Sequence, residues 1–324
     1  MKNNDIKLGI SLYSFSTEFI HEKLDLEELL GKARDMGYKG IELVAAQMVP
    51  EYPYPSGEWL DWLREKLAEY ELEPVCWSAY IDMGIRSDRD LTEDEIVRFT
   101  VNDLMYAKRA GFSLVRTQHA ISPAIYRKMI PYCKKFGVKL AIEMHHPHHP
   151  EVPVWKEYLE LMKGEGKGWL GIVPDFSIFQ TMPHKLYLDQ ALSFGCRPEK
   201  LDEIVQLHRQ GAGEEALEGR DLSEIELHTA KEMFAKFSAP AKLEQWKDII
   251  ECTPYIHGKF YYLENGDHDP CIPFEELLRE IKRLGYKGYI ASEYEGHHFD
   301  ETVDSAVQLE RFVSLCTKIL DSID

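Results

Sequence analysis

Short apolar strand patterns alternate with amphipathic helix patterns along almost the whole chain. The strand patterns stand at residues 7–15, 40–44, 74–79, 114–119, 139–147, 169–175, 255–260 and 288–293. Helix patterns separate them, and the clearest cover residues 59–70, 93–110, 123–136, 155–162 and 274–284. Parallel strands need crossover connections, and eight strand–helix units of this kind close into a barrel. The sequence therefore predicts an α/β protein with a (β/α)8 TIM-barrel fold.

The first helix pattern carries signals for both of its ends. Asp25 and Glu28 form a predicted capping box, and Gly37 is expected to end the helix. The tetrapeptide Gly-Tyr-Lys-Gly stands at residues 37–40 and again at 285–288, each time between a helix and a strand. A doubly wound open sheet is the alternative fold, but it normally has a glycine-rich loop after its first strand. Residues 13–16, Tyr-Ser-Phe-Ser, are not such a loop.

One interval between strands is much longer than the others. Residues 176–256 lie between Asp175 at the end of the sixth strand and His257 within the seventh, and helices are predicted at 198–210, 222–237 and 243–250. We interpret residues 180–250 as a helical insertion within a single domain that spans residues 1–324. The insertion is expected either to cover the carboxyl-terminal mouth of the barrel or to bind another chain.

Composition excludes several classes of function. The net charge of -18 disfavours binding to nucleic acid or to an anionic membrane, and no basic patch offsets it. The 6 cysteines show no Cys-x-x-Cys spacing, and no apolar run approaches the length of about 20 residues that spans a membrane. We expect a cytoplasmic protein.

The strand at 139–147 ends in a carboxylate, two imidazoles and a proline. Alternation along the strand places Glu143 and His145 on the same face. Chemistry in a TIM barrel collects at the carboxyl ends of the strands. The candidate residues at those ends are Glu42, His119, Glu143, His145, Asp175, His257 and Glu293.

Four of these residues come from the last four strands, one from each: Glu143, Asp175, His257 and Glu293. Three converging carboxylates would repel one another unless a cation or a proton lay between them. Ligation by several oxygens and one imidazole suits Mn²⁺ or a similar divalent ion. The sequence therefore predicts a catalytic divalent-metal site, with Mn²⁺ as the expected ion.

These motifs resemble the xylose-isomerase-like barrels, which include ketose epimerases and sugar isomerases. The resemblance rests on Gly-Tyr-Lys-Gly-Ile-Glu-Leu at residues 37–43, the four strand-end residues, and His-x-Lys at His257 and Lys259. It covers nearly the whole chain outside the insertion. It implies that the four residues bind a metal that holds adjacent sugar oxygens.

The chain departs from the epimerase pattern at two places. Ile178 stands where epimerases usually have a substrate-binding histidine, and a histidine run at 145, 146, 148 and 149 follows Glu143. Together with the long insertion, these features are more similar to the large (alpha) subunit of bacterial C-glycoside deglycosidases. That similarity implies a small β-rich second subunit and a hetero-oligomer.

The implied reaction is cleavage of the sugar–aglycone carbon–carbon bond of a 3-oxo-C-glucoside, through a metal-stabilised enediolate and elimination. The alternative is a ketose 3-epimerase or sugar isomerase that uses the same metal site. Catalysis is assigned to His145, Glu143 and Glu293, because an imidazole titrates near neutral pH and shares a face with Glu143. Substrate binding is assigned to Glu42, His119 and Lys259. A catalytically silent barrel with a binding role is a further alternative, but such a protein has no need of three converging carboxylates.

Overall fold

The computed structural model describes residues 5–118, 121–237, 240–264 and 271–323. Its centre is an 8-stranded sheet in the order β6-β5-β4-β3-β2-β1-β8-β7. All the strand pairs described are parallel, and an isolated parallel bridge between Asp175 and His257 links the β6 edge to the β7 edge. The strands are β1 (Lys7–Ser11), β2 (Gly40–Val44), β3 (Glu73–Ser78), β4 (Leu114–Thr117), β5 (Lys139–Met144), β6 (Leu170–Pro174), β7 (Tyr255–Phe260) and β8 (Tyr289–Tyr294). The predicted (β/α)8 barrel is confirmed.

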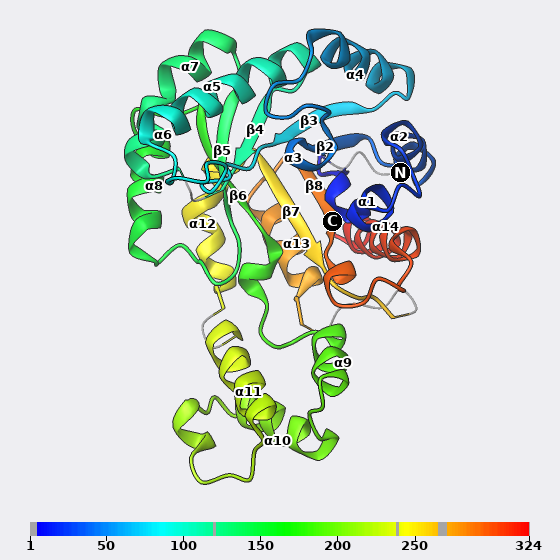
Figure 1. The fold of residues 1–324 in the computed structure, drawn as a ribbon, viewed down its shortest axis with the longest axis vertical. Coiled ribbons are helices and arrows are strands. Elements are labelled where there is room, and N and C mark those ends of the chain that lie inside the picture. Colours follow the sequence, from blue (N-terminus) through cyan, green and yellow to red (C-terminus); the bar gives the residue numbers. More distant parts are fainter. Residues whose placement is uncertain (1–4, 119–120, 238–239, 265–270, 324) are drawn as a thin grey trace.

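Helices surround the barrel and bury their apolar faces against it (Figure 1). They include α1 (Ser16–Ile20), α2 (Leu26–Asp35), α3 (Ala45–Met48), α4 (Gly57–Glu69), α5 (Glu93–Ala110), α6 (Pro123–Lys128), α7 (Ile130–Phe136), α8 (Pro153–Lys163), α12 (Trp246–Ile249), α13 (Phe274–Arg283) and α14 (Ser305–Ser322). The capping box of Asp25 and Glu28 is present at α2. Gly111 ends α5 at a φ of 94°, a left-handed conformation that glycine adopts without steric cost.

Two predicted elements are divided in the structure. The helix expected over residues 123–136 is broken at Met129 into α6 and α7, because Pro131 has no backbone N–H to continue the helical ladder. The strand expected over residues 7–15 ends at Ser11, and a 3-10 turn at Leu12–Phe15 leads into α1. The chain therefore turns at the carboxyl end of β1, and Tyr13 in this turn lines a cavity at that end of the barrel.

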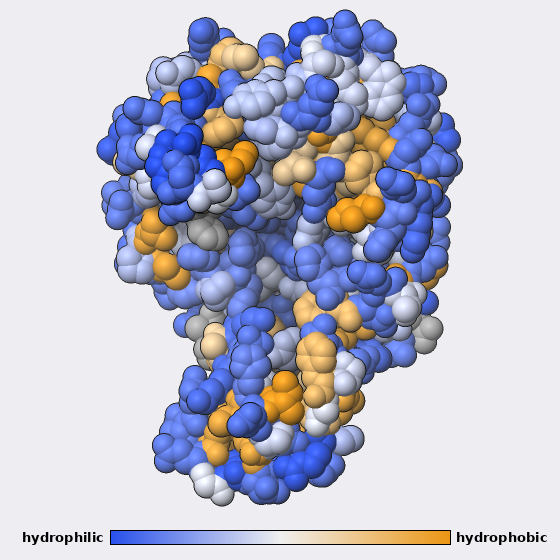
Figure 2. Space-filling view, viewed as in Figure 1, coloured by the Kyte–Doolittle hydropathy of each residue, from blue (hydrophilic) through white to orange (hydrophobic). Residues whose placement is uncertain are grey.

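Helices α9 (Lys185–Ser193), α10 (Pro198–Arg209) and α11 (Glu224–Phe237) lie between β6 and β7 and extend away from the barrel (Figure 1). They share a small core of their own that includes Ile204 and Met233. Hydrophobic side chains also gather on the visible face of these helices (Figure 2). The helix expected over residues 243–250 is divided: the short helix α12 lies between two 3-10 turns, and its Trp246 stacks on Phe179 in the main core.

Among the residues that the structure describes, no helix combines the length and the apolar character that crossing a membrane requires.

Candidate metal centre and active-site cavity

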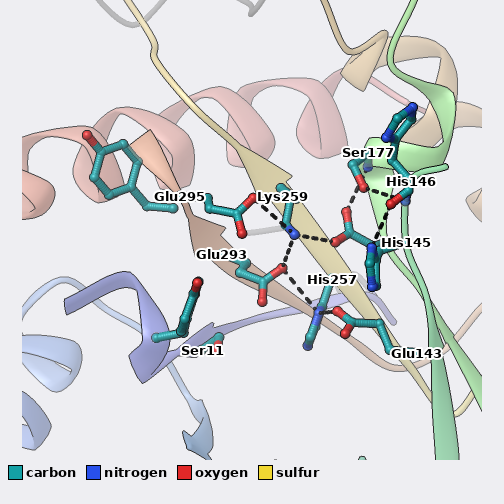
Figure 3. Close-up of polar contacts among 12 residues, drawn as sticks. Ser11, Glu143, His145, His146, Ser177, His257, Lys259, Glu293 and Glu295 are labelled. Atoms are coloured by element: carbon teal, nitrogen blue, oxygen red, sulfur yellow. Dashed lines mark hydrogen bonds and ion pairs between the residues drawn. The ribbon is translucent and has the colours of Figure 1, made fainter. Parts of the chain in front are cut away.

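Four side chains converge at the carboxyl end of the barrel. Each of Glu143, Asp175, His257 and Glu293 offers one ligand atom, and these atoms all lie within 4.8 Å of one another. All four residues are buried. The strand register brings them together, because Asp175 bridges to His257 and the next residues along β7 pair with the end of β8. Figure 3 shows His257 pointing between Glu143 and Glu293.

Close packing holds the strand that carries His257. Gly258 follows it on β7, and a Cβ added there would lie 2.8 Å from the Phe312 ring of α14. A larger residue would therefore push β7 inward and displace the side chains on either side of it. The sequence His-Gly-Lys thus combines two inward polar side chains with one position that only glycine fits without movement.

Glu42 of β2 fixes the orientation of the His257 ring. Its Oε2 lies 2.7 Å from His257 Nε2, and because an ionised carboxylate can only accept, the imidazole donates this hydrogen bond. The other ring nitrogen, Nδ1, lies 2.8 Å from Glu143 Oε1 and 3.2 Å from Glu293 Oε2. A carboxylate that holds one nitrogen of a histidine while the other faces the ligand cluster is the usual arrangement behind a metal-binding histidine.

A fully buried arginine on β4 joins the carboxylates. Arg116 donates to Glu143 Oε2 at 2.8 Å and lies 3.4 Å from Glu42 Oε1. It also donates to the Tyr80 hydroxyl at 3.2 Å. Its guanidinium satisfies the carboxylate oxygens of Glu42 and Glu143 that face away from His257.

Lys259 forms the second cationic contact of the cluster. Its Nζ lies 2.9 Å from Asp175 Oδ2, 3.5 Å from Glu293 Oε2 and 3.2 Å from Glu295 Oε2 (Figure 3). The amide N–H of Ser177 donates to the other oxygen of Asp175 at 2.7 Å. Asp175 is therefore held from two sides.

The buried charges do not balance without a further cation. The carboxylates of Glu42, Glu143, Asp175 and Glu293 are all buried, whereas Arg116 and Lys259 are the two permanent side-chain cations buried among them. A histidine that binds a metal is neutral, and with His257 neutral the excess of two negative charges matches one divalent ion. The donor set of three carboxylates and one imidazole also fits such an ion. These residues fit a divalent metal both in charge and in ligand type.

The side-chain pKa values reflect this crowding. Burial raises the pKa of Asp175 to about 6, against the opposing attraction of Lys259. Burial acts the same way on Glu293, but the charges of His257 and Lys259 outweigh it and lower the pKa to about 2. Burial disfavours the imidazolium of His257, yet Glu293 and Glu42 hold its pKa well above the usual range. Positive charge is therefore strongly favoured at the centre of the cluster.

A cavity of about 570 Å³ opens beside the cluster. Glu143, Glu293 and Lys259 line it together with His145, which follows β5 directly. His145 Nδ1 lies 2.7 Å from the backbone carbonyl of His146. A carbonyl only accepts, so Nδ1 carries the proton, and in the neutral ring Nε2 has the lone pair.

The helices between β6 and β7 supply another wall of the same cavity. Tyr187 of α9 and Lys236 and Phe237 of α11 line it. His146 joins this wall to the barrel, because its Nε2 contacts the Lys236 carbonyl and its ring lies 5.6 Å from that of Phe237. Burial lowers the pKa of His146 to about 4, so this imidazole is neutral near pH 7.

The structure brings together most, but not all, of the residues that the sequence singled out. Glu143, Asp175, His257, Glu293, His145 and Lys259 lie at one site, whereas His119 lies outside the described residues. Glu42 is fully buried and bonded to His257, and it does not line the cavity. This placement favours a role in holding His257 over the predicted contact with a sugar hydroxyl.

Sequence reasoning did not identify Arg116 or Tyr80. A signal for Arg116 was available, because a lone charge in the strand pattern Leu-Val-Arg-Thr at 114–117 needs buried partners. Tyr13 also lines the cavity, whereas Phe15, Trp77, Phe176 and Phe179 belong to the core.

Comparisons with known proteins agree with this fold. The chain is 30% identical over 312 residues to the C-glycoside deglycosidase alpha subunit of Arthrobacter globiformis, covering 93% of this chain and 88% of that one. It is 29% identical to the 3'-dehydrocarminate deglycosidase alpha subunit of a Microbacterium species, covering 92% and 90%.

Similar solved structures include an L-ribulose 3-epimerase, with a TM-score of 0.60 and 13% identity over 98% of this chain and 95% of that one. The IOLI protein with a binding zinc atom has the same TM-score and identity, over 98% and 99%. At such low identity these two likenesses concern the fold alone. The family model for the xylose isomerase-like TIM barrel matches residues 30–312. The chain belongs to the xylose isomerase-like TIM-barrel family.

Proposed function

We propose that this chain is the catalytic subunit of a divalent-metal-dependent C-glycoside deglycosidase. Its substrate would be a 3-oxo-C-glucoside, and the bond broken would be the carbon–carbon bond between the sugar and the aglycone. The observation that carries the proposal is the 25–30% identity, over nine-tenths or more of the chain, to proteins named as deglycosidase alpha subunits. The buried ligand cluster beside a cavity that contains a histidine supports it.

The metal would be held by Glu143, Asp175, His257 and Glu293, and Mn²⁺ is the ion we expect. When bound, a divalent ion supplies Lewis acidity toward the ketone of the sugar. The reaction also needs a base for the proton on C2, which lies between the ketone carbon and C1. As that proton leaves, its electron pair forms the C1–C2 double bond, the C1–aglycone bond breaks, and the aglycone carbon takes up a proton.

His145 is the residue we assign to proton transfer. It lines the cavity beside Glu143, and its Nδ1–H is committed to the His146 carbonyl at 2.7 Å. That contact sets the tautomer in which Nε2 accepts a proton, as a general base must. Lys259 lines the same cavity, and we assign its ammonium group to a substrate oxygen. The deglycosidase relatives are named alpha subunits, so we further propose that the chain works with a second, small and β-rich subunit.

A ketose 3-epimerase or sugar isomerase is the second candidate, because the same cluster and base would serve proton transfer next to a ketone. The residue at the position that usually carries a substrate-binding histidine in epimerases argues against this second candidate. Here it is Ile178, which is 1% exposed and packs in the core rather than lining the cavity.

The test compares substrates on the Mn²⁺-loaded chain, alone and with a candidate second subunit. We expect a 3-oxo-C-glucoside to release its aglycone and a free ketohexose to remain unchanged. Glu143→Gln should abolish release, whereas Glu310→Gln, an exchange at an exposed position of α14, should not. Epimerised ketose without any aglycone release would move the assignment to the second candidate.

A further inference from the structure

A second, smaller cavity adjoins the first. Its volume is about 180 Å³, and it shares Ala46 and Tyr80 with the larger cavity. The loops that follow β2 and β3 build most of its wall, and α5 adds Phe99. Its character differs from that of the larger cavity, because its wall is mainly aromatic and aliphatic: Tyr52, Pro53, Ile81, Ile85, Leu91 and Phe99.

Tyr80 connects this apolar pocket to the metal cluster. Its hydroxyl accepts a hydrogen bond from Arg116 at 3.2 Å, and the guanidinium carbon lies 5.0 Å from the centre of its ring. Arg116 in turn donates to Glu143 at 2.8 Å. The residue between the two cavities is therefore two contacts away from a predicted metal ligand, and its position is set by the same network.

A buried carboxyl group fixes another part of the wall. The Tyr52 hydroxyl donates to Asp103 with 3.2 Å to each carboxyl oxygen, and the Trp77 indole donates to the same group at 3.0 Å. Asp103 is buried, and none of the proposed catalytic steps uses it. Burying a carboxyl group costs free energy, so its presence is best explained by the side chains it orients. Tyr52 is thus held in place before any ligand arrives.

We propose that this apolar pocket binds an aromatic ring of the aglycone while the sugar lies in the larger cavity beside the candidate metal ligands. The inference rests on the proposed deglycosidase function and adds the place of the second half of the substrate. A C-glycoside joins a polar sugar directly to an aromatic group, which matches a polar cavity joined to an apolar one. Volume also agrees, because an apolar cavity of about 150 Å³ accepts benzene in another protein. Asp82, the charged residue on the wall, would accept a hydrogen bond from a phenolic hydroxyl.

The first experiment measures binding of 2-naphthol to the full, Mn²⁺-loaded chain by its fluorescence. We expect saturable binding that Ile85→Asp weakens roughly tenfold or more, because small changes in an apolar contact are worth at least that factor. Ile85 is 49% exposed, so the exchange should not disturb folding. Leu91→Trp, which fills the pocket, is the second variant. Phe194→Asp, at a residue 64% exposed on the far helices, is the matched control and should bind like the unaltered chain.

The second experiment measures KM for a 3-oxo-C-glucoside with a naphthyl aglycone in the same variants. We expect KM to rise in Ile85→Asp and Leu91→Trp but not in Phe194→Asp. Naphthol binding that depends on the pocket, without turnover of any C-glycoside, would support the pocket and refute the proposed function. The inference is overturned if the unaltered chain binds no naphthol saturably. It is also overturned if aglycone is released with a KM that neither pocket variant changes.

Discussion

Replacement of Glu42 by glutamine separates two roles for this residue. The exchange keeps the size of the side chain and removes its charge. Glu42 is fully buried, and its carboxylate accepts from His257 at 2.7 Å and from the Ser11 hydroxyl at 3.0 Å. If Glu42 holds His257 for the metal, the variant should bind the metal less tightly.

The size of the effect follows from the contact that is lost. A hydrogen bond to a charged group contributes about 1.5–3 kcal/mol, and a change of about 1.4 kcal/mol is tenfold in an equilibrium constant. The dissociation constant for Mn²⁺ should therefore rise by about 10- to 100-fold, the range found when partners of metal-binding histidines are replaced. At saturating Mn²⁺, KM for the sugar should not change, because Glu42 does not line the cavity.

The assay is competition for Mn²⁺ between the protein and a fluorescent chelator. Ser11→Ala is the control, because it removes a neutral donor to Glu42 and keeps the carboxylate, so its effect should be much smaller. An unchanged dissociation constant in a folded Glu42→Gln variant would refute the argument. A raised KM with unaltered metal affinity would instead restore the contact with a sugar hydroxyl that the sequence predicted.

Three further predictions follow from the buried charges. Removal of the divalent ion with a chelator should lower the melting temperature by several degrees, because a ligand present at about 100 times its Kd adds about 2.7 kcal/mol to the free energy of unfolding. Added Mn²⁺ should restore the melting temperature. Glu143→Gln should show a much smaller response in the same thermal scan. Arg116→Met should lower the free energy of unfolding of the metal-free protein by about 3–5 kcal/mol, since it leaves two carboxylates buried without their partner; a loss below about 1 kcal/mol in urea titrations would contradict this. Burial raises the pKa of Asp103 from 3.8 to about 7, against the hydrogen bonds from Trp77 and Tyr52. The folded state therefore binds this proton more tightly than the unfolded state, and its contribution to stability is lost as the pH rises from about 4 through about 7. Asp103→Asn should remove that part of the pH dependence, which amounts to up to about 4 kcal/mol; equal slopes for both proteins between pH 4 and pH 8 would show that Asp103 does not titrate in this way.

The sequence predicted that the four candidate ligands converge, because one rule governs the placement of strand-end residues in a parallel barrel. Residues at the carboxyl ends of neighbouring strands must meet, so Glu143, Asp175, His257 and Glu293 could be grouped without knowledge of any distance. Alternation along a strand also places Glu42 on the inward face. Alternation does not predict how deep in the barrel a side chain lies. That depth decides whether the Glu42 carboxylate lies next to the sugar or bonds to His257 Nε2.

Other features depend on contacts that no local pattern encodes. Arg116 is paired with carboxylates from two other strands, and the pocket beside Tyr80 forms where the loops after β2 and β3 meet α5. Loop conformations of this kind are set by packing over long sequence distances. The prediction that residues 180–250 are an insertion stays a prediction, although part of the segment carries a core of its own.

The geometry divides the two halves of the proposed reaction between two kinds of element. Glu143, His257 and Glu293 lie on strands, and hydrogen bonds between neighbouring strands of the barrel fix their positions. The groups proposed to face the ketone are therefore rigid. Loops hold Ile81 and Ile85, which face the proposed aglycone. Loop exchanges in a barrel alter binding while the scaffold stays intact. Changes at the apolar pocket should therefore alter which aglycone is accepted and leave metal binding unaffected, whereas a change at Glu42, which lines neither cavity, should weaken metal binding and leave the choice of aglycone unaltered.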